Sequence, residues 1–169
     1  MTRVTKAAIA CFVLMGGLTL GSAAASAQSS SSGGSIQVWL TPSLTGKGGK
    51  ILITGAIADS GVTKGNKTGK AVLKKGTITV NLTQFQAAQN NANPQINQSN
   101  CSGFFTASAP VPIVSGTGAY AGISGSFTLN SQFAFILPKT KSGACNTSNN
   151  ANPISQYGAV SGSGTVTLP

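Results

Sequence analysis

Apolar and polar residues alternate along most of the chain after residue 35. In the first such stretch, Ile36, Val38 and Leu40 share one face, while Trp39 lies among the polar residues of the other face. Alternation at a period of two is typical of β-strands that bury one face against a core. Similar patterns, or more continuous apolar runs, mark four further predicted strands at residues 50–58, 76–83, 126–137 and 157–168.

Helical periodicity is weak in the same part of the chain, where only residues 84–89 indicate a single helical turn. About seven or eight strands separated by turns rich in Gly, Asn, Ser and Pro indicate a sandwich or a closed barrel. Gly162 and Gly164 fall on the inward face of the last strand, and glycine inside a strand often marks a tight bend or a bulge. We therefore predict a small antiparallel β-barrel of about eight strands, formed by residues 36–169 as a single domain.

The first 27 residues have the features of a secretory signal peptide. Arg3 and Lys6 precede an apolar run at residues 7–20, and an Ala-Ser-Ala sequence ending at Ala27 matches a cleavage site. The apolar run is shorter than the roughly 20 residues that a membrane span requires. We therefore expect cleavage between Ala27 and Gln28, bacterial export, and a secreted or envelope-associated protein that has no transmembrane span after the leader is removed.

Two cysteines remain after that cleavage, Cys101 and Cys145. An even number of cysteines in an exported protein indicates a disulfide, and two cysteines allow one pairing. The bond would stabilise the fold by roughly 3–4 kcal/mol, because it restricts the unfolded chain. Residues 28–35 are rich in Ser and Gly and are expected to form a flexible leader before the domain.

The charge composition excludes most enzyme mechanisms. The chain has 11 lysines and arginines, a single acid, Asp59, and no histidine. It can form no carboxylate pair, no Ser-His-Asp triad and no metal site of histidines and carboxylates. Asp59 begins an Asp-Ser-Gly sequence, which has the composition of a turn. We therefore predict no catalytic residue, no metal site and no cofactor, and we favour a non-enzymatic function.

Seven of the nine lysines after residue 27 are concentrated between residues 47 and 75. They are Lys47, Lys50, Lys64, Lys67, Lys70, Lys74 and Lys75. A cationic surface of this kind attracts an anionic polymer such as an envelope polysaccharide. Lysines also discourage edge-to-edge association of strands, and the sequence leaves both interpretations open. The absence of arginine after residue 27 argues against sequence-specific nucleic-acid binding, because contacts to guanine favour arginine.

Two asparagine-rich segments, residues 89–100 and 146–155, adjoin the two cysteines, and both contain Asn-Asn-Ala-Asn-Pro. We predict that the disulfide holds these segments side by side on one rim of the barrel. Paired asparagines could hydrogen-bond a carbohydrate or another polar ligand. Asparagine and proline are also ordinary turn formers, which is the simpler interpretation.

Four glycines surround Tyr120 within residues 114–125. A nucleotide-binding loop would need a preceding strand, a following helix and a later acid, and no acid follows this segment. The segment instead predicts a tight turn between two strands, with Tyr120 packed as a plug.

The Gly116–Tyr120 turn before a long predicted strand resembles the turn of the allene oxide cyclase-like and dirigent-like β-barrels, including small secreted bacterial proteins of that type. The resemblance implies an eight-stranded antiparallel barrel whose apolar interior holds a small hydrophobic ligand. It transfers no activity, because catalytic members of those families are expected to use acidic or basic side chains inside the barrel. This sequence matches none of them.

The sequence therefore predicts an exported non-enzymatic β-barrel protein that binds a small apolar ligand inside the barrel or an anionic envelope polymer on its lysines. The alternative is a dirigent- or cyclase-like protein that guides a reactive intermediate inside the barrel. The candidate ligand-binding residues of such an interior are Trp39, Tyr120 and Tyr157.

N-terminal sequencing tests the expected processing. When the chain is produced with its own leader in an exporting bacterium, the exported protein should begin at Gln28, because small residues at the cleavage site fit the processing enzyme. Ala27→Phe should abolish this cleavage, since a bulky residue replaces a small one. An exported wild-type protein that retains residues 1–27 would contradict the prediction.

Overall fold

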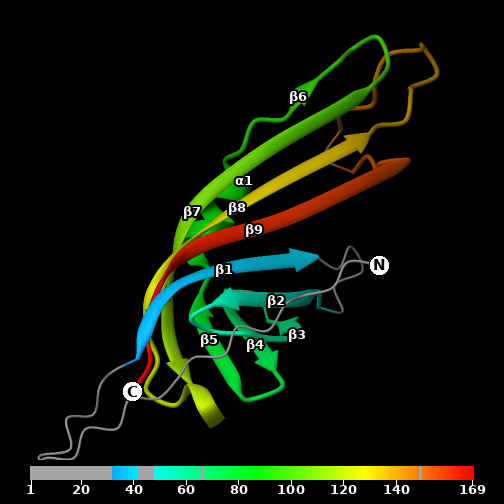
Figure 1. Ribbon diagram of the computed structural model, residues 1–169. Helices are drawn as coiled ribbons and strands as arrows, with labels where there is room; N and C mark the ends of the chain where they lie inside the picture. The colour runs from blue at the N-terminus through cyan, green and yellow to red at the C-terminus, as the bar shows by residue number, and fades with distance from the viewer. Residues whose placement is uncertain (1–31, 42–47, 66, 149) are drawn as a thin grey trace, which may run out of the picture.

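A computed structural model describes residues 32–41, 48–65, 67–148 and 150–169 of the chain (Figure 1). The predicted signal peptide with its cleavage position, residues 28–31 of the predicted leader and Lys47 lie outside these described residues. The described residues form nine strands, one α-helix and one turn of 3-10 helix. Neither helix in this part of the chain is long and apolar enough to span a lipid bilayer.

The strands form one antiparallel sheet that closes on itself. In chain order the elements are β1 (Gly33–Thr41), β2 (Lys50–Gly55), β3 (Asp59–Lys64), β4 (Thr68–Leu73), β5 (Thr77–Asn81), α1 (Thr83–Asn90), β6 (Gln95–Ile96), β7 (Ser102–Gly116), η1 (Gly118–Tyr120), β8 (Ser124–Ile136) and β9 (Ser155–Thr167). Eight strands close the ring in the order β1-β2-β3-β4-β5-β7-β8-β9, and β9 pairs with β1. The short strand β6 pairs with β7 outside this ring. The predicted all-β barrel is therefore confirmed.

Alternating side chains of the strands fill the barrel interior. Ile36 and Val38 of β1 are buried in the main core, whereas the neighbouring Trp39 is exposed. The same alternation buries Leu129 and Ser131 of β8, so the predicted inward faces of these strands are confirmed. Burial of one face of each strand is what drives the sheet to close around an apolar interior.

The two inward glycines of β9 allow close approach to β8. A Cβ atom on Gly164 would lie 2.4 Å from the Cα atom of Phe127. A Cβ atom on Gly162 would lie 2.6 Å from the carbonyl oxygen of Thr128. Any larger residue at either position would push the two strands apart, which explains why glycine interrupts the apolar face of β9.

Strands β7, β8 and β9 extend beyond the barrel as a three-stranded arm (Figure 1). The pairing of β9 with β1 ends where Val160 faces Leu40, whereas β9 and β8 stay paired as far as Ser155 opposite Ile136. We define the arm as residues 102–106 of β7, 132–136 of β8 and 155–159 of β9, together with β6. The sequence patterns did not predict this extension.

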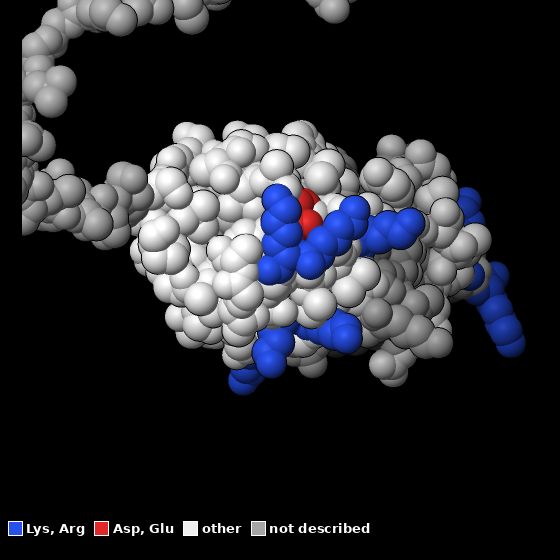
Figure 2. All heavy atoms as spheres, turned by 60° about the horizontal axis from the view of Figure 1, so that its bottom comes forward, with Lys and Arg blue, Asp and Glu red and all other residues white. Residues whose placement is uncertain are grey.

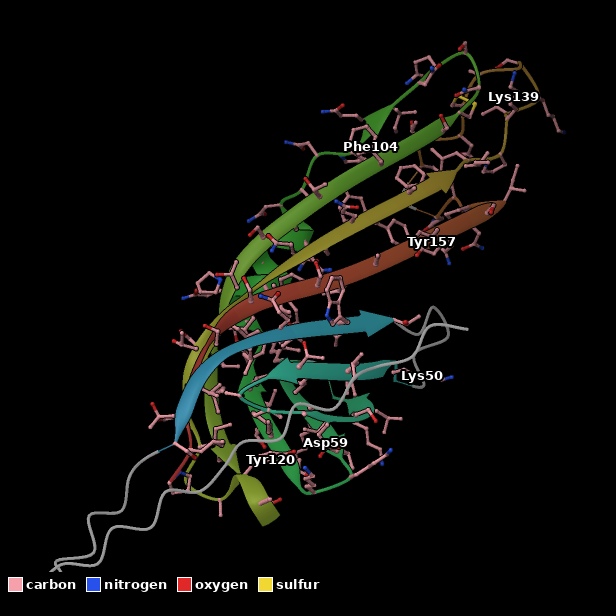
Figure 3. All side chains as sticks on the ribbon, viewed as in Figure 1. Lys50, Asp59, Phe104, Tyr120, Lys139 and Tyr157 are labelled. Atoms are coloured by element: carbon pink, nitrogen blue, oxygen red, sulfur yellow. A yellow bond between two sulfur atoms is a disulfide. The ribbon has the colours of Figure 1, made fainter. Side chains whose placement is uncertain are left out.

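The predicted disulfide joins Cys101 to Cys145, which are 44 positions apart. Both cysteines are buried beside Leu137 in a small apolar cluster that is separate from the main core. The disulfide is therefore confirmed. Its predicted place on a rim of the barrel is wrong, because β7 and β8 continue past the barrel and carry the bond to the far end of the arm (Figure 3).

The strands predicted at residues 76–83, 126–137 and 157–168 differ from the observed strands by one or two residues at each end, and three other elements differ more. Strand β1 begins at Gly33, which pairs with Thr167 of β9, so the predicted flexible leader overlaps a strand. The apolar run at residues 50–58 is not one strand, because Gly55 takes a φ of 97° and ends β2. Helix α1 has eight residues rather than a single turn, and its Phe85 is buried in the main core.

The arm should depend on the disulfide more than the barrel does. Replacing both cysteines, Cys101→Ser with Cys145→Ser, removes a cross-link from the arm cluster and leaves the main core intact. We expect faster hydrogen exchange at Leu137 and Asn146, whose N–H groups donate to the carbonyl oxygens of Cys101 and Pro138, while the amides of β1 stay protected. Equal acceleration in barrel and arm would contradict this expectation.

Candidate functional site

The barrel contains an apolar cavity of about 320 Å³. Its described lining comes from strands around the ring and from α1, and it includes Val38, Ile51, Ala71, Val80, Phe85 and Leu129. Ligand pockets commonly measure roughly 300–1,000 Å³, so this cavity is at the lower end of the range. It has the size and the apolar lining that a small organic molecule requires.

One end of the cavity is lined by small and polar residues, and we call this end the mouth. Gly48 and Gly49 lie before β2, and Gly65 follows β3. The hydroxyl oxygen of Thr63 accepts a hydrogen bond of 2.9 Å from the N–H group of Gly49, which joins the two sides of the mouth. Lys64 lines the same end.

The described lining offers little acid–base chemistry. Its ionisable residues are Lys64 and Lys70, whose side chains are exposed on the outer faces of β3 and β4, and no acid belongs to it. Within the described ranges, no three His, Cys, Asp or Glu side chains lie together in a way that could hold a metal ion. The cavity is therefore suited to binding by shape and apolar contact.

The other end of the barrel is closed by Tyr120, which is 4% exposed and packs in the main core. Its hydroxyl donates a hydrogen bond of 2.6 Å to Oδ2 of Asp59, the first residue of β3 (Figure 3). Gly118 takes a φ of 62°, and a Cβ atom on Gly116 would lie 1.9 Å from the carbonyl oxygen of Tyr120. These glycines let the turn fold back over the barrel, so the predicted plug is confirmed.

The carboxylate of Asp59 ties together segments that are distant in the sequence. Besides the Tyr120 hydroxyl, it accepts hydrogen bonds from the N–H groups of Ser60 at 2.7 Å, Lys74 at 3.3 Å and Lys75 at 2.9 Å. The two lysines belong to the turn between β4 and β5. Asp59 therefore caps backbone groups, but the turn predicted from its Asp-Ser-Gly sequence is wrong, because these residues begin strand β3.

Burial and hydrogen bonding act in opposite directions on Asp59. Burial raises the pKa of its carboxyl, but the hydrogen bonds from Tyr120 and from the backbone of Lys75, Ser60 and Lys74 outweigh burial and lower that pKa from 3.8 to about 2. Burial and the adjacent carboxylate raise the pKa of Tyr120 above its ordinary value. The pair is therefore a carboxylate and a neutral phenol at neutral pH, which makes it a structural contact.

The three aromatic residues that were predicted to line an interior ligand site do not meet there. Tyr120 closes the barrel but lies outside the cavity lining. Trp39 is 54% exposed on the outer face of β1, and Tyr157 is 71% exposed on the arm (Figure 3). This prediction is wrong, because the alternation that directs Val38 and Leu40 inward directs Trp39 outward.

Phe85 is a lining residue that the sequence pattern did not indicate. Helix α1 follows β5 directly and brings Phe85 into the cavity lining together with Leu82, which precedes the helix. The available signal was a pair of apolar residues three positions apart in an otherwise polar segment. That signal is too short to distinguish a core helix from a loop.

The described lysines of the predicted cationic segment are all exposed, and they are Lys50, Lys64, Lys67, Lys70, Lys74 and Lys75. Several lie on the outer faces of β2, β3 and β4, and the others lie in the adjoining turns. Asp59 is 8% exposed, and Figure 2 shows it as a small area between lysine side chains. The exposed charged side chains of the described residues are therefore lysines.

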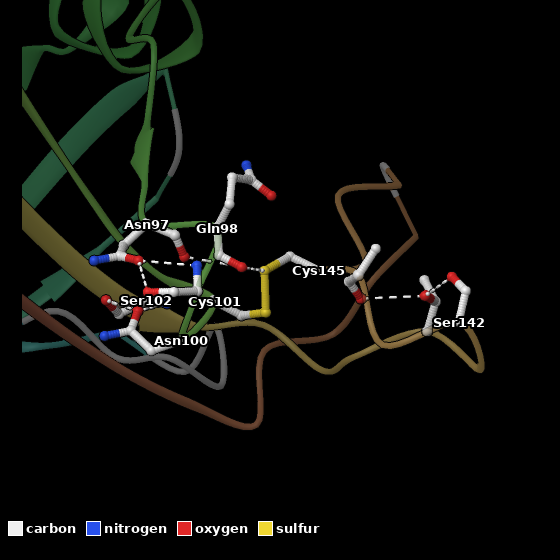
Figure 4. The surroundings of a disulfide bond; sticks show 10 residues. Asn97, Gln98, Asn100, Cys101, Ser102, Ser142 and Cys145 are labelled. Carbon is white, nitrogen blue, oxygen red and sulfur yellow. Dashed lines mark hydrogen bonds between the residues drawn. A yellow bond between two sulfur atoms is a disulfide. The ribbon is translucent and has the colours of Figure 1, made fainter.

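The asparagines next to the disulfide are used in local turns (Figure 4). Oδ1 of Asn97 accepts hydrogen bonds from the N–H and hydroxyl groups of Ser99. Oδ1 of Asn100 accepts hydrogen bonds from the same two groups of Ser102. The disulfide joins the end of the first asparagine-rich segment to the start of the second. The second repeat includes Asn149, which lies outside the described residues. The contacts favour asparagine as a turn former here.

Asp59 should set the stability of the protein in acid. Because its pKa is lower in the folded protein than the ordinary 3.8, its contribution is complete above about pH 4 and is lost as the pH falls toward 2. The shift corresponds to about 2 kcal/mol of unfolding free energy. Urea unfolding at neutral and acid pH should show this loss, and Asp59→Asn should be less stable at neutral pH with a much smaller loss in acid.

Tyr120→Phe provides the control, because it keeps the buried ring and removes one hydrogen bond to the carboxylate. It should lower the unfolding free energy by about 1.5–3 kcal/mol. It should also raise the pKa of Asp59 in the folded protein toward its ordinary value, so the loss of stability in acid becomes smaller and ends at a higher pH. Identical pH profiles for the wild type and Asp59→Asn would contradict the role of Asp59.

No protein-family model, curated protein or solved structure matches this chain. The resemblance of the Gly116–Tyr120 turn to the allene oxide cyclase-like and dirigent-like barrels stays a prediction.

Proposed function

We propose that this protein binds a small apolar molecule inside its barrel. The observation that carries the proposal is the apolar cavity of about 320 Å³, which the strands surround and Tyr120 closes at one end of the barrel. Protein interiors are otherwise packed about as densely as organic crystals, and an unfilled space lowers stability. A ligand that fills the space contributes roughly 25 cal/mol for each Å² of apolar surface removed from water.

A binding role accounts for the chemistry of the lining better than catalysis does. Lys64 and Lys70 are the ionisable residues of the described lining, and their side chains are exposed on the outer faces of their strands. Asp59 lies outside the lining, where it accepts hydrogen bonds from Tyr120 and from the backbone. The cyclase- or dirigent-like alternative would use the same interior and guide an intermediate by shape. It stays a prediction, since no acid or base is positioned in the described cavity to assist a reaction.

Export from a bacterial cell is part of the proposal. The Cys101–Cys145 disulfide supports it, because disulfides persist in oxidising compartments and are rare in the cytosol. The signal peptide at residues 1–27 would deliver the protein there.

A second candidate function is attraction of an anionic polymer to the lysine surface. The observation that favours it is that the one acid, Asp59, is buried, so lysines supply the exposed charged side chains of the described surface. Such a surface attracts polyanions over about 8 Å at physiological ionic strength.

A substitution that fills the cavity tests the first proposal. Ala71 of β4 lines the cavity, whereas Ala109 of β7 does not, and each alanine is 8% exposed. Ala71→Leu should abolish binding of the neutral apolar fluorophore N-phenyl-1-naphthylamine and keep or raise the melting temperature, because the new side chain occupies existing space. Ala109→Leu should lower the unfolding free energy by about 1–3 kcal/mol, because it overpacks the core.

Fluorescence titration of the purified protein measures the binding, and thermal unfolding measures stability. The wild type should bind the probe, and Ala71→Leu should not. Equal binding by the wild type and Ala71→Leu would overturn the proposal. Destabilisation of Ala71→Leu to the extent of Ala109→Leu would also overturn it, since it would show that the space is already filled by the protein.

A further inference from the structure

We propose that the outer wall of the barrel carries a separate binding groove for a linear acidic polysaccharide that contains uronate sugars. The proposal rests on the second candidate function, the cationic surface, and gives it a defined site. It is independent of the interior cavity, because the residues that it uses point away from the barrel interior.

The groove crosses the outer face of the sheet and has a volume of about 960 Å³. Its lining residues come from β4, β3, β2, β1, β9 and β8, which are neighbours in the ring. Adjacent strands are roughly 4.8 Å apart, so the groove is about 24 Å long. This length fits several sugar rings of an extended chain better than one small molecule.

A row of paired residues forms the centre of the groove. Asn130 faces Ser161, Ser161 faces Trp39, Trp39 faces Leu52, and Leu52 faces Ser60 on successive strands. Trp39 is 54% exposed and Leu52 is 47% exposed. The row therefore presents an aromatic ring and an aliphatic side chain in the middle, with an amide and a hydroxyl toward one end and a hydroxyl at the other.

A parallel row adds positive charge beside this apolar centre. Lys50 faces Val62, and Val62 faces Val72 on the next strand. Lys74 lines the end of the groove on the β4 side, and Gln132 lines it on the β8 side. The lining contains two lysines and no acid, and the buried carboxylate of Asp59 lies behind Ser60 and Lys74, so the lining itself carries positive charge that attracts an anionic ligand.

These groups match the chemistry of a uronate chain. The C–H face of a sugar ring stacks on the electron-rich face of an aromatic ring such as Trp39. The side-chain amides of Asn130 and Gln132 both donate and accept hydrogen bonds, as sugar hydroxyls require. Lys50 and Lys74 supply compact positive charges for carboxylates along the chain.

Two other anionic partners fit the groove less well. Single-stranded nucleic acid binds proteins through successive stacking aromatics and a continuous basic track, whereas Trp39 is the aromatic residue of this lining. A bilayer surface is contacted by protruding apolar side chains, whereas Trp39 and Leu52 lie within a groove. Oligothymidylate and anionic phospholipid vesicles serve as the probes for these two partners.

Trp39 is the single tryptophan of the chain, so its fluorescence reports directly on this site. An oligogalacturonate of defined length should change the Trp39 fluorescence at low salt, and the affinity should fall as salt rises. The fully methyl-esterified oligosaccharide, which has no charge, should bind at least about tenfold more weakly. Tighter binding of oligothymidylate or of anionic phospholipid vesicles, with the same fluorescence change, would overturn the assignment of the ligand.

Matched variants separate the groove from general attraction of polyanions. Lys50→Ala with Lys74→Ala removes the two groove lysines, whereas Lys139→Ala with Lys141→Ala removes the same charge from the loop that follows β8. Calorimetry should show about fivefold weaker binding for the first pair and less than about twofold weaker binding for the second. Equal losses would overturn the groove while leaving general attraction in place.

Aromatic variants test the stacking contact. Trp39→Ala should weaken oligogalacturonate binding about tenfold in calorimetry, and Trp39→Phe should restore most of it. Tyr157→Ala removes an exposed aromatic side chain outside the groove and should leave binding unchanged.

Binding that leaves the Trp39 fluorescence unchanged would overturn the groove. No binding even at low salt would overturn both the groove and the cationic-surface candidate, without bearing on the interior cavity.

Discussion

Pairing between β5 and the end of β7 closes the barrel, and the cavity exists only because of that closure. Ile78 of β5 faces Gly116 of β7, and the Gly116–Tyr120 turn follows at once. Asp59 holds this region together by accepting hydrogen bonds from the Tyr120 hydroxyl and from the N–H group of Lys75, next to the start of β5. Strand closure and the plug at the barrel end are therefore one structural unit, and its loss would leave β5 as an open edge and admit water to the core.

The distribution of charge follows from this use of Asp59. The chain has one acid, and the fold buries it among hydrogen-bond donors that lower its pKa to about 2. The exposed charged side chains of the described surface are consequently lysines. A carboxylate engaged in this way keeps its negative charge, but it belongs to the lining of neither the groove nor the cavity. The burial of Asp59 among these donors thus leaves lysine as the exposed charged residue of the described surface and leaves the described cavity lining without a carboxylate.

One sheet supports both proposed sites, because successive residues of a strand point to opposite faces. Val38 contributes to the cavity, and the next residue, Trp39, lies in the outer groove. The wall of the barrel therefore separates the proposed site for apolar molecules from the proposed site for charged sugars. Residues such as Trp39 were rightly placed on the polar face by their sequence pattern. They were wrongly assigned to an interior site because they are aromatic.

Local periodicity in the sequence determined that the chain forms β-strands and which residues of β1, β8 and β9 point inward, because side-chain direction alternates in any strand. The glycines around Tyr120 determined the turn between β7 and β8. The single pair of cysteines after the leader determined the disulfide. Tertiary structure alone decided the arm, the position of the disulfide at its end and the volume of the cavity, which depend on strand lengths and register. It alone also brought Tyr120 to Asp59 across 61 positions. Such contacts arise from long-range pairing, and a shift of one residue in register would reverse every face, so no local pattern encodes them.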